Sequence, residues 1–321
     1  MIIYHLLAIT FALIIDLFIG DPPKWPHPVK WIGSFIAFLN KKWNKGNHRR
    51  FKGVMMLGLV LVLTSVITVS IIILLYHLHP IAGVIGEALI IATTIAQKGL
   101  KDAGLDVYQP LVNKDIPLAR EKLSYIVGRD TEQLDESEIV RGTVETIAEN
   151  TSDGITAPLF WAIIGGAPLA MVYRAINTCD SMVGYRNPQY EQFGWASARL
   201  DDIVNWIPSR LTGFFMLFIT KPAYRNWKSA WKLLFRDARK HPSPNSGWCE
   251  AAVAIILGVQ LGGLNYYKGI ASNRAKMGEP FETLEAVHIK KTIYIMNMSV
   301  LFFLLFIWIG GIAIDIAITW R

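Results

Sequence analysis

The stretch from Val54 to Tyr76 holds 23 residues without one charged side chain. About 20 predominantly apolar residues suffice for a helix to cross the hydrocarbon core of a bilayer. The composition agrees, because 52% of the residues are hydrophobic and only 18% are charged, against about 25% charged in soluble domains. The net charge of +7 would suit nucleic acid, an anionic membrane surface or phosphorylated substrates. The distribution of apolar residues favours the membrane, so we predict an integral membrane protein.

Three further segments are predicted to cross the bilayer: Ile2–Ile19, Ile81–Ala96 and Ile293–Ile318. The first lacks the basic start and the cleavage site of a signal peptide, so we expect a retained helix. The residues from Gly20 to Gly53 carry eight Lys or Arg and one Asp, which places them in the cytoplasm by the positive-inside rule. The polar stretch Gln97–Gly154 is then cytoplasmic as well.

Two other apolar segments are interrupted. Ile155–Ile176 contains Gly165, Gly166 and Pro168 at its middle. It either crosses the bilayer or dips in and returns as a re-entrant hairpin, and broken backbone is tolerated at that depth only where protein or water covers it. Ile203–Ile219 presents the same choice, because Pro208 and Arg210 lie within it. We favour re-entry for the first segment, since it keeps all charged motifs on one side.

The remaining segments are predicted to be cytoplasmic or buried. Pro117–Val127 is a short helix, and Asp135 with Glu138 forms a capping box that opens a helix to about Asn150. The basic stretch from 221 to 240 is a cytoplasmic loop with seven Lys or Arg, and the stretch from 250 to 264 is a buried or interfacial helix. The fold class is therefore all-α: a polytopic membrane protein with interrupted or re-entrant apolar segments, cytoplasmic helical loops and a single domain over residues 1–321.

Carboxylates spaced four apart mark the first candidate site. Glu145, Glu149 and Asp153 would share one helix face, with Asn150 beside them. Hard oxygen ligands in this arrangement suit Mg²⁺. The alternative is an ordinary solvated face of a cytoplasmic helix.

Polar residues at helical spacing form a second candidate beside an apolar segment; they are Tyr173, Arg174, Asn177, Asp180, Ser181, Tyr185 and Arg186. A structural ion pair between Arg174 and Asp180 would explain two of them but not Asn177, Ser181 and Arg186. Charged groups next to a membrane segment are costly and tend to be functional, so we interpret this group as part of a site.

A third candidate follows shortly after, in Arg199, Asp201, Asp202 and Asn205. Asp201 and Asn205 are four residues apart and can hold the Mg²⁺ of a di- or triphosphate, while Arg199 and Arg210 would meet phosphate oxygens. Helix capping is the alternative. The sequence contains no P-loop and no dinucleotide-type glycine motif, so any nucleotide is bound without them.

The loop from His241 to Gly247 is the fourth candidate. Asn245 or Ser246 can cap the helix that carries Glu250, and the exposed amides of a helix start attract phosphate. The same loop contains Ser243. A proline-stiffened turn around His27 is similar, although an isolated histidine there is usually structural, and a plain capping loop remains the alternative for the residues from 241 to 247.

Together these motifs resemble the adenosylcobinamide-phosphate synthase family of cobalamin biosynthesis, the CobD/CbiB type. The resemblance covers the chain from Asp16 to Gly269 in order. The earlier motifs that carry it are Gly20-Asp21-Pro22, Pro26-His27-Pro28, Arg129-Asp130-Thr131, Val144-Glu145-Thr146, Ala148-Glu149-Asn150, Asp153-Gly154 and Ala157-Pro158-Leu159-Phe160-Trp161. The later ones are Tyr173-Arg174, Asn177-Thr178, Asp180 to Arg186, Ala198 to Asp202, Pro208, Arg210-Leu211-Thr212 and Ser243-Pro244-Asn245 through Glu250.

The resemblance implies a membrane ligase that joins a carboxylate of adenosylcobyric acid to the amine of an aminoalcohol phosphate and consumes ATP with Mg²⁺. Either aminopropanol phosphate or ethanolamine phosphate would fit. The active site would face the cytoplasm from a multi-pass protein of the cytoplasmic membrane. The partners implied are this corrinoid, the aminoalcohol phosphate, ATP and the lipid bilayer, without nucleic acid; homo-oligomerisation stays open.

Roles can be assigned to the matching positions on this basis. The catalytic residues would be Glu145, Glu149, Arg174, Asp180, Arg186, Arg199 and His241. Substrates would be bound by His27, Asn150, Asn177, Ser181, Tyr185, Arg210, Ser243, Asn245 and Glu250. The metal ligands would be Asp153, Asp201, Asp202 and Asn205.

Two other functions are compatible with parts of the sequence. A membrane prenyltransferase also binds a Mg²⁺-diphosphate through acidic residues such as Asp201 and Asp202, but it would need a second acidic motif and a long apolar groove. A transporter would use Glu87, Arg174 and Arg210 as coupling charges within the membrane. The absence of an inverted repeat and the large polar loops argue against transport.

Overall fold

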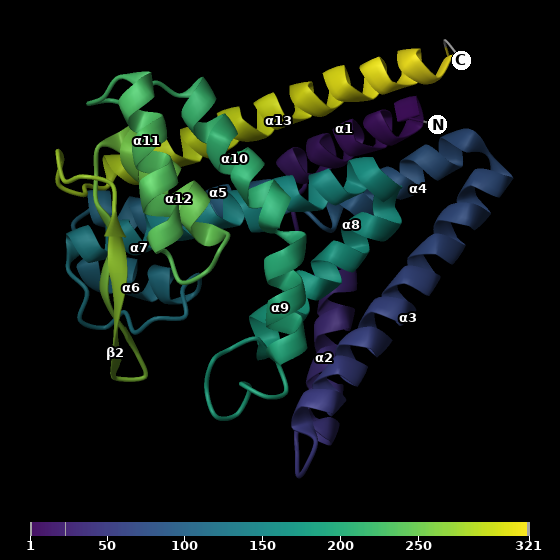
Figure 1. The fold of residues 1–321 in the computed structure, drawn as a ribbon, viewed down its shortest axis with the longest axis horizontal. Helices are drawn as coiled ribbons and strands as arrows, with labels where there is room; N and C mark the ends of the chain where they lie inside the picture. Colours follow the sequence, from purple (N-terminus) through teal and green to yellow (C-terminus); the bar gives the residue numbers. More distant parts are fainter. Residues whose placement is uncertain (1, 23, 320–321) are drawn as a thin grey trace. The chain divides into compact units, whose positions relative to one another are not determined.

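The computed structural model describes residues 2–22 and 24–319 (Figure 1). Nearly all regular structure in this part of the chain is helical, which confirms the predicted fold class. The helices are α1 (Ile2–Phe18), α2 (Pro28–Trp43), α3 (Arg49–Leu78), α4 (Pro80–Ala92), α5 (Gln97–Val112), α6 (Ile116–Ser124), α7 (Glu136–Thr151), α8 (Ala157–Val183), α9 (Trp195–Val204), α10 (Trp206–Ile219), α11 (Trp227–Asp237), α12 (Ser246–Leu257) and α13 (Val287–Thr319). A π-helical turn (Ser152–Thr156), a 3₁₀ turn (Ala238–Lys240) and two strands, β1 (Leu261–Tyr267) and β2 (Ile270–Met277), complete the elements.

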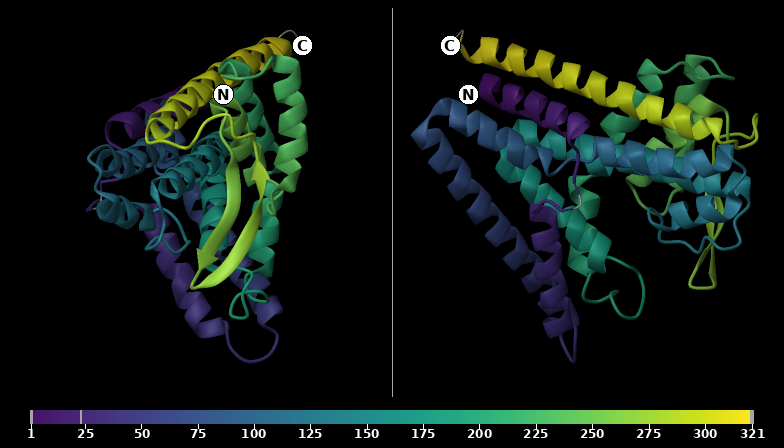
Figure 2. Two further views of the ribbon diagram at one scale, coloured as in Figure 1. Left: turned by 90° about the vertical axis from the view of Figure 1, so that its left-hand side faces the viewer. Right: turned by 180° about the vertical axis from the view of Figure 1, so that it is seen from behind.

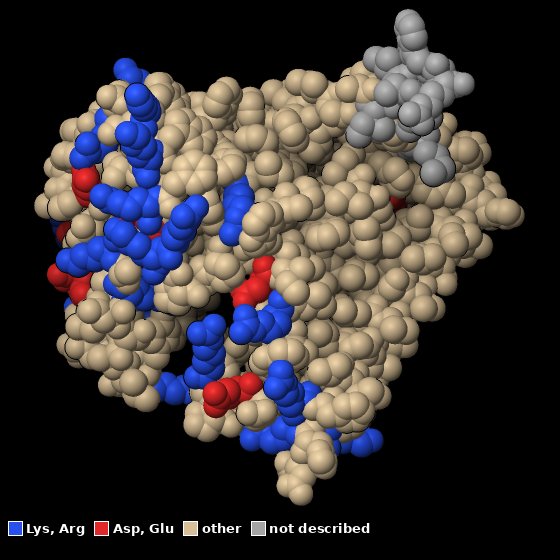
Figure 3. All heavy atoms as spheres, viewed as in Figure 1, with Lys and Arg blue, Asp and Glu red and all other residues tan. Residues whose placement is uncertain are grey.

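Four helical stretches of the described chain are long and apolar enough to cross a membrane; they are Arg49–Leu78, Pro80–Val112, Glu136–Val183 and Val287–Ala313. The predicted spans at 54–76 and 293–318 are confirmed as helices. The helix over the span predicted as Ile81–Ala96 ends earlier, at Ala92, and α5 begins after a short break. With 17 residues, α1 belongs with α10 and α12 to the shorter apolar helices. Figure 3 shows few charged side chains on the face formed by α3 and α4.

The chain divides into two compact units, which we describe separately. Unit 1 comprises Met1–Ala96, Asp153–Asn205 and Leu304–Arg321, and unit 2 comprises Gln97–Ser152 and Trp206–Phe303. In unit 1, α3 packs against α4 and α8, and α1 packs against α4. A core cluster that includes Met56, Cys179 and Phe193 joins α2, α3 and α8 to the segment before α9.

The interruption predicted at the middle of 155–176 is confirmed. Within α8, Gly165 has φ −148° and ψ 31°, and Gly166 has φ 62° and ψ −157°. The second of these conformations is essentially restricted to glycine. Figure 1 shows that the axis of α8 changes direction sharply at the break, and Pro168 then occupies the start of the second half, where its missing N–H is not needed. Whether this segment crosses or re-enters the membrane stays a prediction.

Unit 2 places α12 at its centre. Every residue from Ser246 to Leu257 is buried, which confirms the predicted buried helix, but its limits differ from 250–264. The helix ends before Gly258, which adopts φ 71°, and Leu261 already belongs to β1. A left-handed glycine is a common helix terminator. The capping box of α7 is confirmed, with both of its hydrogen bonds present.

The two strands form an antiparallel hairpin, which the sequence analysis did not predict (Figure 2). Its turn contains Lys268 with φ 52° and Gly269 with φ 76°. Two successive positive φ values define the tight turn that matches the twist of paired strands. The hairpin therefore depends on a Lys-Gly pair that is a weaker signal than the usual Asn-Gly.

One segment that we predicted as a loop is largely helical. In the basic stretch from 221 to 240, α11 begins where the Asn226 side chain accepts a hydrogen bond from the Ser229 N–H. Figure 3 shows Lys and Arg side chains gathered over this part of the unit. Between residues 20 and 53, α2 begins at Pro28. The loop predicted from 221 to 240 was wrong because α11 is short and amphipathic, so charge obscured its apolar face.

Candidate functional site

A polar cluster in unit 1 lies between the second half of α8 and α9. Asp201 accepts hydrogen bonds from the side chains of Asn177, at 3.4 Å, and Asn205, at 3.0 Å. The Tyr173 hydroxyl donates to Asn205 Oδ1 at 2.8 Å. Asp201 lies within α9 rather than at its start, so the helix-capping interpretation is wrong for this residue. The structure thus joins the second and third candidate groups of the sequence.

Like charges make this cluster attractive to a cation. Asp201 is only 9% exposed, and burial together with the nearby Asp180 carboxylate raises its pKa to about 7. Burial also raises the pKa of Asp202, although the positive charges of Arg199 and Arg186 act in the opposite direction. A cation beside Asp180 and Asp201 would relieve their repulsion.

The donor set fits Mg²⁺ bound together with a phosphorylated substrate. No group of three or more acidic, His or Cys side chains suited to a metal ion occurs in the described part of the chain. Mg²⁺ nevertheless commonly uses one or two carboxylates and completes its shell with water and substrate phosphates. Asp180 and Asp201 can supply that number, with the amide oxygens of Asn177 and Asn205 near by.

Other residues of this group occupy less central positions. Arg174 donates to Asn177 Oδ1 at 3.3 Å, and its buried Nε has no hydrogen-bond partner among the described residues. Ser181 donates to the Asn177 carbonyl within its own helix, and Tyr185 is exposed beside Tyr190. The Arg174 guanidinium therefore retains an unused donor.

Glu145, in unit 2, is engaged by structural partners. Arg129 binds its Oε2, and the Gly262 N–H donates to Oε1 at 2.8 Å. Arg141 lies 3.5 Å from Oε1 and also donates to the carbonyls of Gly262 and Leu264. This carboxylate thus ties the hairpin to α7. The sequence analysis did not pair the two arginines with Glu145, although Arg141 precedes it by four residues, the usual spacing of a helical ion pair.

Asp130 fixes the other end of the hairpin. Its two carboxylate oxygens accept from the backbone N–H groups of Lys268, at 2.9 Å, and Gly269, at 2.7 Å. Arg129 also donates to Asn265 of β1, so the Arg129-Asp130 pair holds the hairpin at a strand residue and at its turn. The sequence analysis quoted this motif without assigning it a function.

The common face expected for three carboxylates stays a prediction. Glu149 lies on α7, and Asp153 lies in the π-helical turn that follows. A π-turn adds a residue to each hydrogen-bonded ring, so the helical repeat changes between these two carboxylates. Asn150 donates to the Thr146 carbonyl of its own helix.

The loop before α12 forms a second polar cluster, in unit 2. Ser246 donates to Glu149 at 2.7 Å, and His241 Nε2 lies 3.5 Å from Glu250 Oε1. Glu250 is 1% exposed, and burial with the charges of Glu145 and Glu149 raises its pKa well above the usual range. Burial lowers the pKa of His241. Both shifts favour the uncharged forms of Glu250 and His241.

The cap of α12 differs from the prediction. Asn245 occupies the cap position, but its side chain makes no capping bond. Ser243 Oγ instead accepts from the N–H groups of Asn245, at 3.2 Å, and Ser246, at 3.4 Å. Asn245 Oδ1 accepts from Arg210, so both side chains that we expected to bind substrate also shape the loop.

Arg210 is held between two indole rings. Its guanidinium lies 4.2 Å from the ring centre of Trp206 and 5.0 Å from that of Trp248. It also donates to the carbonyls of Trp206 and Pro244. A pocket of about 480 Å³ opens here. Arg210 thus stabilises this loop and also lines the pocket.

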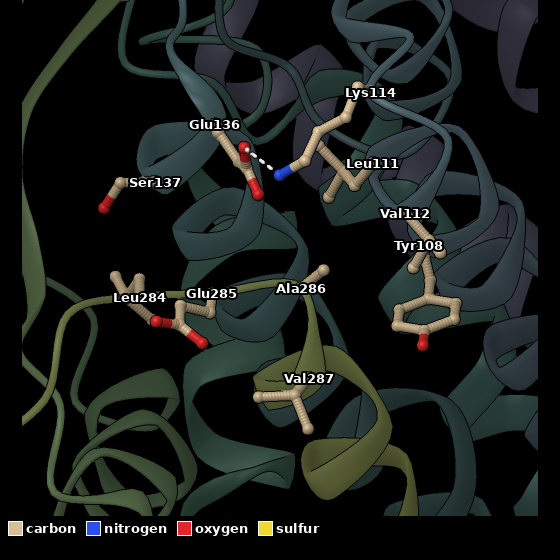
Figure 4. A pocket seen from close by; sticks show the side chains of 10 residues that line it. All are labelled: Tyr108, Leu111, Val112, Lys114, Glu136, Ser137, Leu284, Glu285, Ala286 and Val287. Atoms are coloured by element: carbon tan, nitrogen blue, oxygen red, sulfur yellow. Dashed lines mark hydrogen bonds and ion pairs between the residues drawn. The ribbon is translucent and has the colours of Figure 1, made fainter.

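Two features lie apart from these clusters. His27 contacts Asp21 at 3.0 Å in the turn before α2. A pocket of about 600 Å³ in unit 2, shown in Figure 4, is bordered by the Lys114–Glu136 pair, and no predicted site residue lines it.

The fold and the acidic cluster around Asp201 define a polytopic helical membrane protein with polar side chains beside a broken apolar helix. Residues 9–296 match the family model described as CobD/Cbib protein. The chain belongs to the CobD/Cbib family.

Curated relatives agree over nearly the whole chain. A cobalamin biosynthesis protein CobD from Halalkalibacterium halodurans is 54% identical over 312 residues, which cover 97% of this chain and 98% of the relative. Proteins of the same name from Clostridium perfringens, at 44% identity over 91% of this chain and 94% of theirs, and from Geobacter metallireducens, at 46% over 90% and 91%, are also similar. No solved structure matches the chain.

Proposed function

We propose that this chain is the ATP-dependent amide ligase of cobalamin biosynthesis that joins adenosylcobyric acid to an aminoalcohol phosphate. The product is adenosylcobinamide phosphate. Membership of the CobD/Cbib family, whose relatives are named cobalamin biosynthesis proteins, supports the pathway. The observation that carries the chemistry is the buried Asp201 beside Asp180, with Asn177 and Asn205 bonded to it.

The reaction proceeds through an activated carboxylate, because a carboxylate and an amine do not condense unaided in water. An oxygen of the corrinoid carboxylate attacks the γ-phosphorus of ATP, and ADP leaves. The amine nitrogen then attacks the acyl carbon, so that the C–N bond forms while the C–O bond to phosphate breaks. The amine loses a proton to a protein carboxylate or imidazole.

The residues of unit 1 suit the phosphate half of this scheme. Asp180 and Asp201 would hold Mg²⁺, which supplies neutralisation of phosphate charge when bound. Arg186 and Arg199, whose charges act on Asp202, would bind phosphate oxygens and stabilise the transferring group. Arg174 would use its unbonded Nε for the same purpose.

A two-substrate assay tests the proposal. Detergent-purified protein is incubated with ATP, Mg²⁺, adenosylcobyric acid and either aminopropanol phosphate or ethanolamine phosphate. We expect phosphate release that requires both the corrinoid and the amine, together with a corrinoid product heavier by one aminoalcohol phosphate less one water. Release of phosphate without corrinoid, or a product without the amide, would refute the ligase.

The two alternative functions predict other results. A prenyltransferase would release diphosphate from an isoprenoid substrate in the same preparation. A transporter would accumulate a substrate in vesicles without consuming the corrinoid carboxylate. Glu87, one of the coupling charges that a transporter would use, already accepts hydrogen bonds from Tyr76 and Ala167, which argues against that role.

A further inference from the structure

Glu87 is a fully buried carboxylate on the apolar helix α4. Such a group within a membrane segment is costly unless it is paired. Its position is not explained by the polar clusters described above. It therefore requires a function of its own.

Three helices supply partners to this carboxylate. His5 Nδ1 of α1 lies 2.9 Å from Oε1, and the Tyr76 hydroxyl of α3 donates to Oε2 at 2.7 Å. The Ala167 N–H of α8 donates to Oε1 at 3.1 Å. Glu87 thus joins its own helix to α1, α3 and the second half of α8.

The contact with Tyr76 depends on a missing side chain. A Cβ at Gly83 would lie 2.3 Å from the Tyr76 ring, so the ring rests directly on the backbone of α4. Gly83 and Glu87 are four residues apart and share a helix face. Because Gly83 has no side chain, the Tyr76 hydroxyl can reach Glu87.

The contact with Ala167 coincides with the break in α8. Ala167 directly follows Gly166, whose φ is 62°, and a Cβ on Gly166 would come 2.0 Å from Glu87 Oε1. Glu87 accordingly accepts from a backbone N–H at the start of the second half-helix. Negative charge at that end of a helix is favourable, so the carboxylate acts as a cap supplied by another helix.

We infer that Glu87 is a positioning residue that sets the direction of the second half of α8. This half carries Tyr173, Asn177 and Asp180, which form one wall of the cluster around Asp201. If the half-helix rotates or tilts, these side chains move relative to α9. The consequence for catalysis rests on the proposed function, but the geometric inference does not.

A distance measurement tests the geometry without an activity assay. Spin labels are attached to cysteines at Ile164, on the first half of α8, and Ser181, on the second, with Cys179 and Cys249 replaced by Ala. The native Glu87 should give one narrow distance distribution. Glu87→Ala should broaden or shift it, and Glu87→Gln, whose side-chain oxygen still accepts from Ala167, should largely restore it.

The matched control is Glu121→Gln. Glu121 also accepts from a tyrosine hydroxyl, that of Tyr125, but in an exposed pair on α6. This variant should leave the distribution unchanged. A folded Glu87→Ala protein with the native distribution would overturn the inference. Should that variant not fold, Gly166→Ala crowds Glu87 Oε1 beside the Ala167 contact, and Tyr76→Phe removes the hydrogen bond to Oε2. A native distribution in both overturns the inference equally.

Kinetics of the folded variants separate this inference from the proposed function. We expect kcat of Glu87→Ala to fall by about a hundredfold, since displacements near 1 Å can have that effect, with partial recovery in Glu87→Gln. If the distances change but the wild-type protein has no ligase activity, the proposed function fails and the positioning role stands. If wild-type activity is present and kcat is unchanged while the distances shift, the link to the site fails.

Discussion

The Tyr173 hydroxyl lies 2.8 Å from Asn205 Oδ1, and this hydrogen bond joins the broken helix α8 to the end of α9. The same hydroxyl lies 3.1 Å from the Asp153 carbonyl oxygen. Asn205 in turn donates to Asp201. Tyr173 therefore orients Asn205 and, through it, Asp201, which would hold the proposed metal ion.

Tyr173→Phe should weaken both folding and turnover. The ring stays in place, but Asn205 Oδ1 loses its donor in a buried environment. Loss of such a bond costs about 1–3 kcal/mol. Thermal unfolding in detergent measures the effect, with Tyr294→Phe, at an exposed position of α13, as the control. An unfolding midpoint equal to that of the control would mean that the bond contributes nothing.

Local features of this fold were predictable. Two signals depend only on residues that are close in the sequence: the uncharged stretch of 23 residues from Val54 to Tyr76 and the capping box at Asp135. The structure contains both the helix and the capping box. The break at Gly165 and Gly166 was visible for the same reason. Hydrophobic length, capping chemistry and glycine content are properties of short windows.

Long-range pairs were not predictable from these windows. Arg129 binds Asn265, which is 136 residues away, and Glu87 finds its partners on three other helices. The π-turn at Ser152 was hidden as well, because an insertion in the helical repeat leaves no compositional signal. For the candidate site, the sequence therefore indicated the residue types but not that Glu145 would be used to hold a hairpin.

Glu145→Gln should destabilise the hairpin more than it alters chemistry. Removal of the negative charge leaves Arg129 and Arg141 buried without their common partner, and breaking a buried pair costs about 3–5 kcal/mol. We expect a lower unfolding midpoint and faster hydrogen exchange at the Gly262 amide. Glu132→Gln, on an exposed loop, is the control. Native stability and exchange with lost turnover would instead support the catalytic role predicted from the sequence.

Glu250 should make stability fall as pH rises. Its folded pKa is raised well above the ordinary value, so between about pH 4.5 and that folded pKa only the unfolded chain gives up the proton. Stability present below pH 4.5 is thus lost through this window. Glu250→Gln has no proton to lose.

The difference in unfolding midpoint between Glu250→Gln and the wild type should therefore grow from pH 5 to pH 8. His241, with a lowered pKa, contributes the opposite slope below about pH 6.5, but it is common to both proteins. Glu132→Gln should follow the wild type throughout. Parallel pH profiles for wild type and Glu250→Gln would contradict the raised pKa.

Membrane topology can be checked with single cysteines at Asn113 and Asn187 after Cys179 and Cys249 are replaced. Both asparagines are exposed. If the charged motifs share the cytoplasmic side, both cysteines should resist an impermeant thiol reagent in whole cells and react in inverted vesicles. Labelling at 187 from outside would mean that the segment before it crosses the bilayer.

Asp201→Asn should preserve the fold and abolish turnover. At its pKa of about 7 the carboxyl is already half protonated at neutral pH, so a neutral isostere removes repulsion with Asp180, and the unfolding midpoint should stay equal or rise. Loss of a charged metal ligand should lower turnover by about a hundredfold or more, with partial recovery at high Mg²⁺. Asp102→Asn, in an exposed pair with Lys98, is the matched control. Phosphate release at the wild-type rate and ordinary Mg²⁺ would exclude Asp201 as a ligand. The assignment would then move to Glu149, because among the described side chains only Ser246 donates a hydrogen bond to its carboxylate.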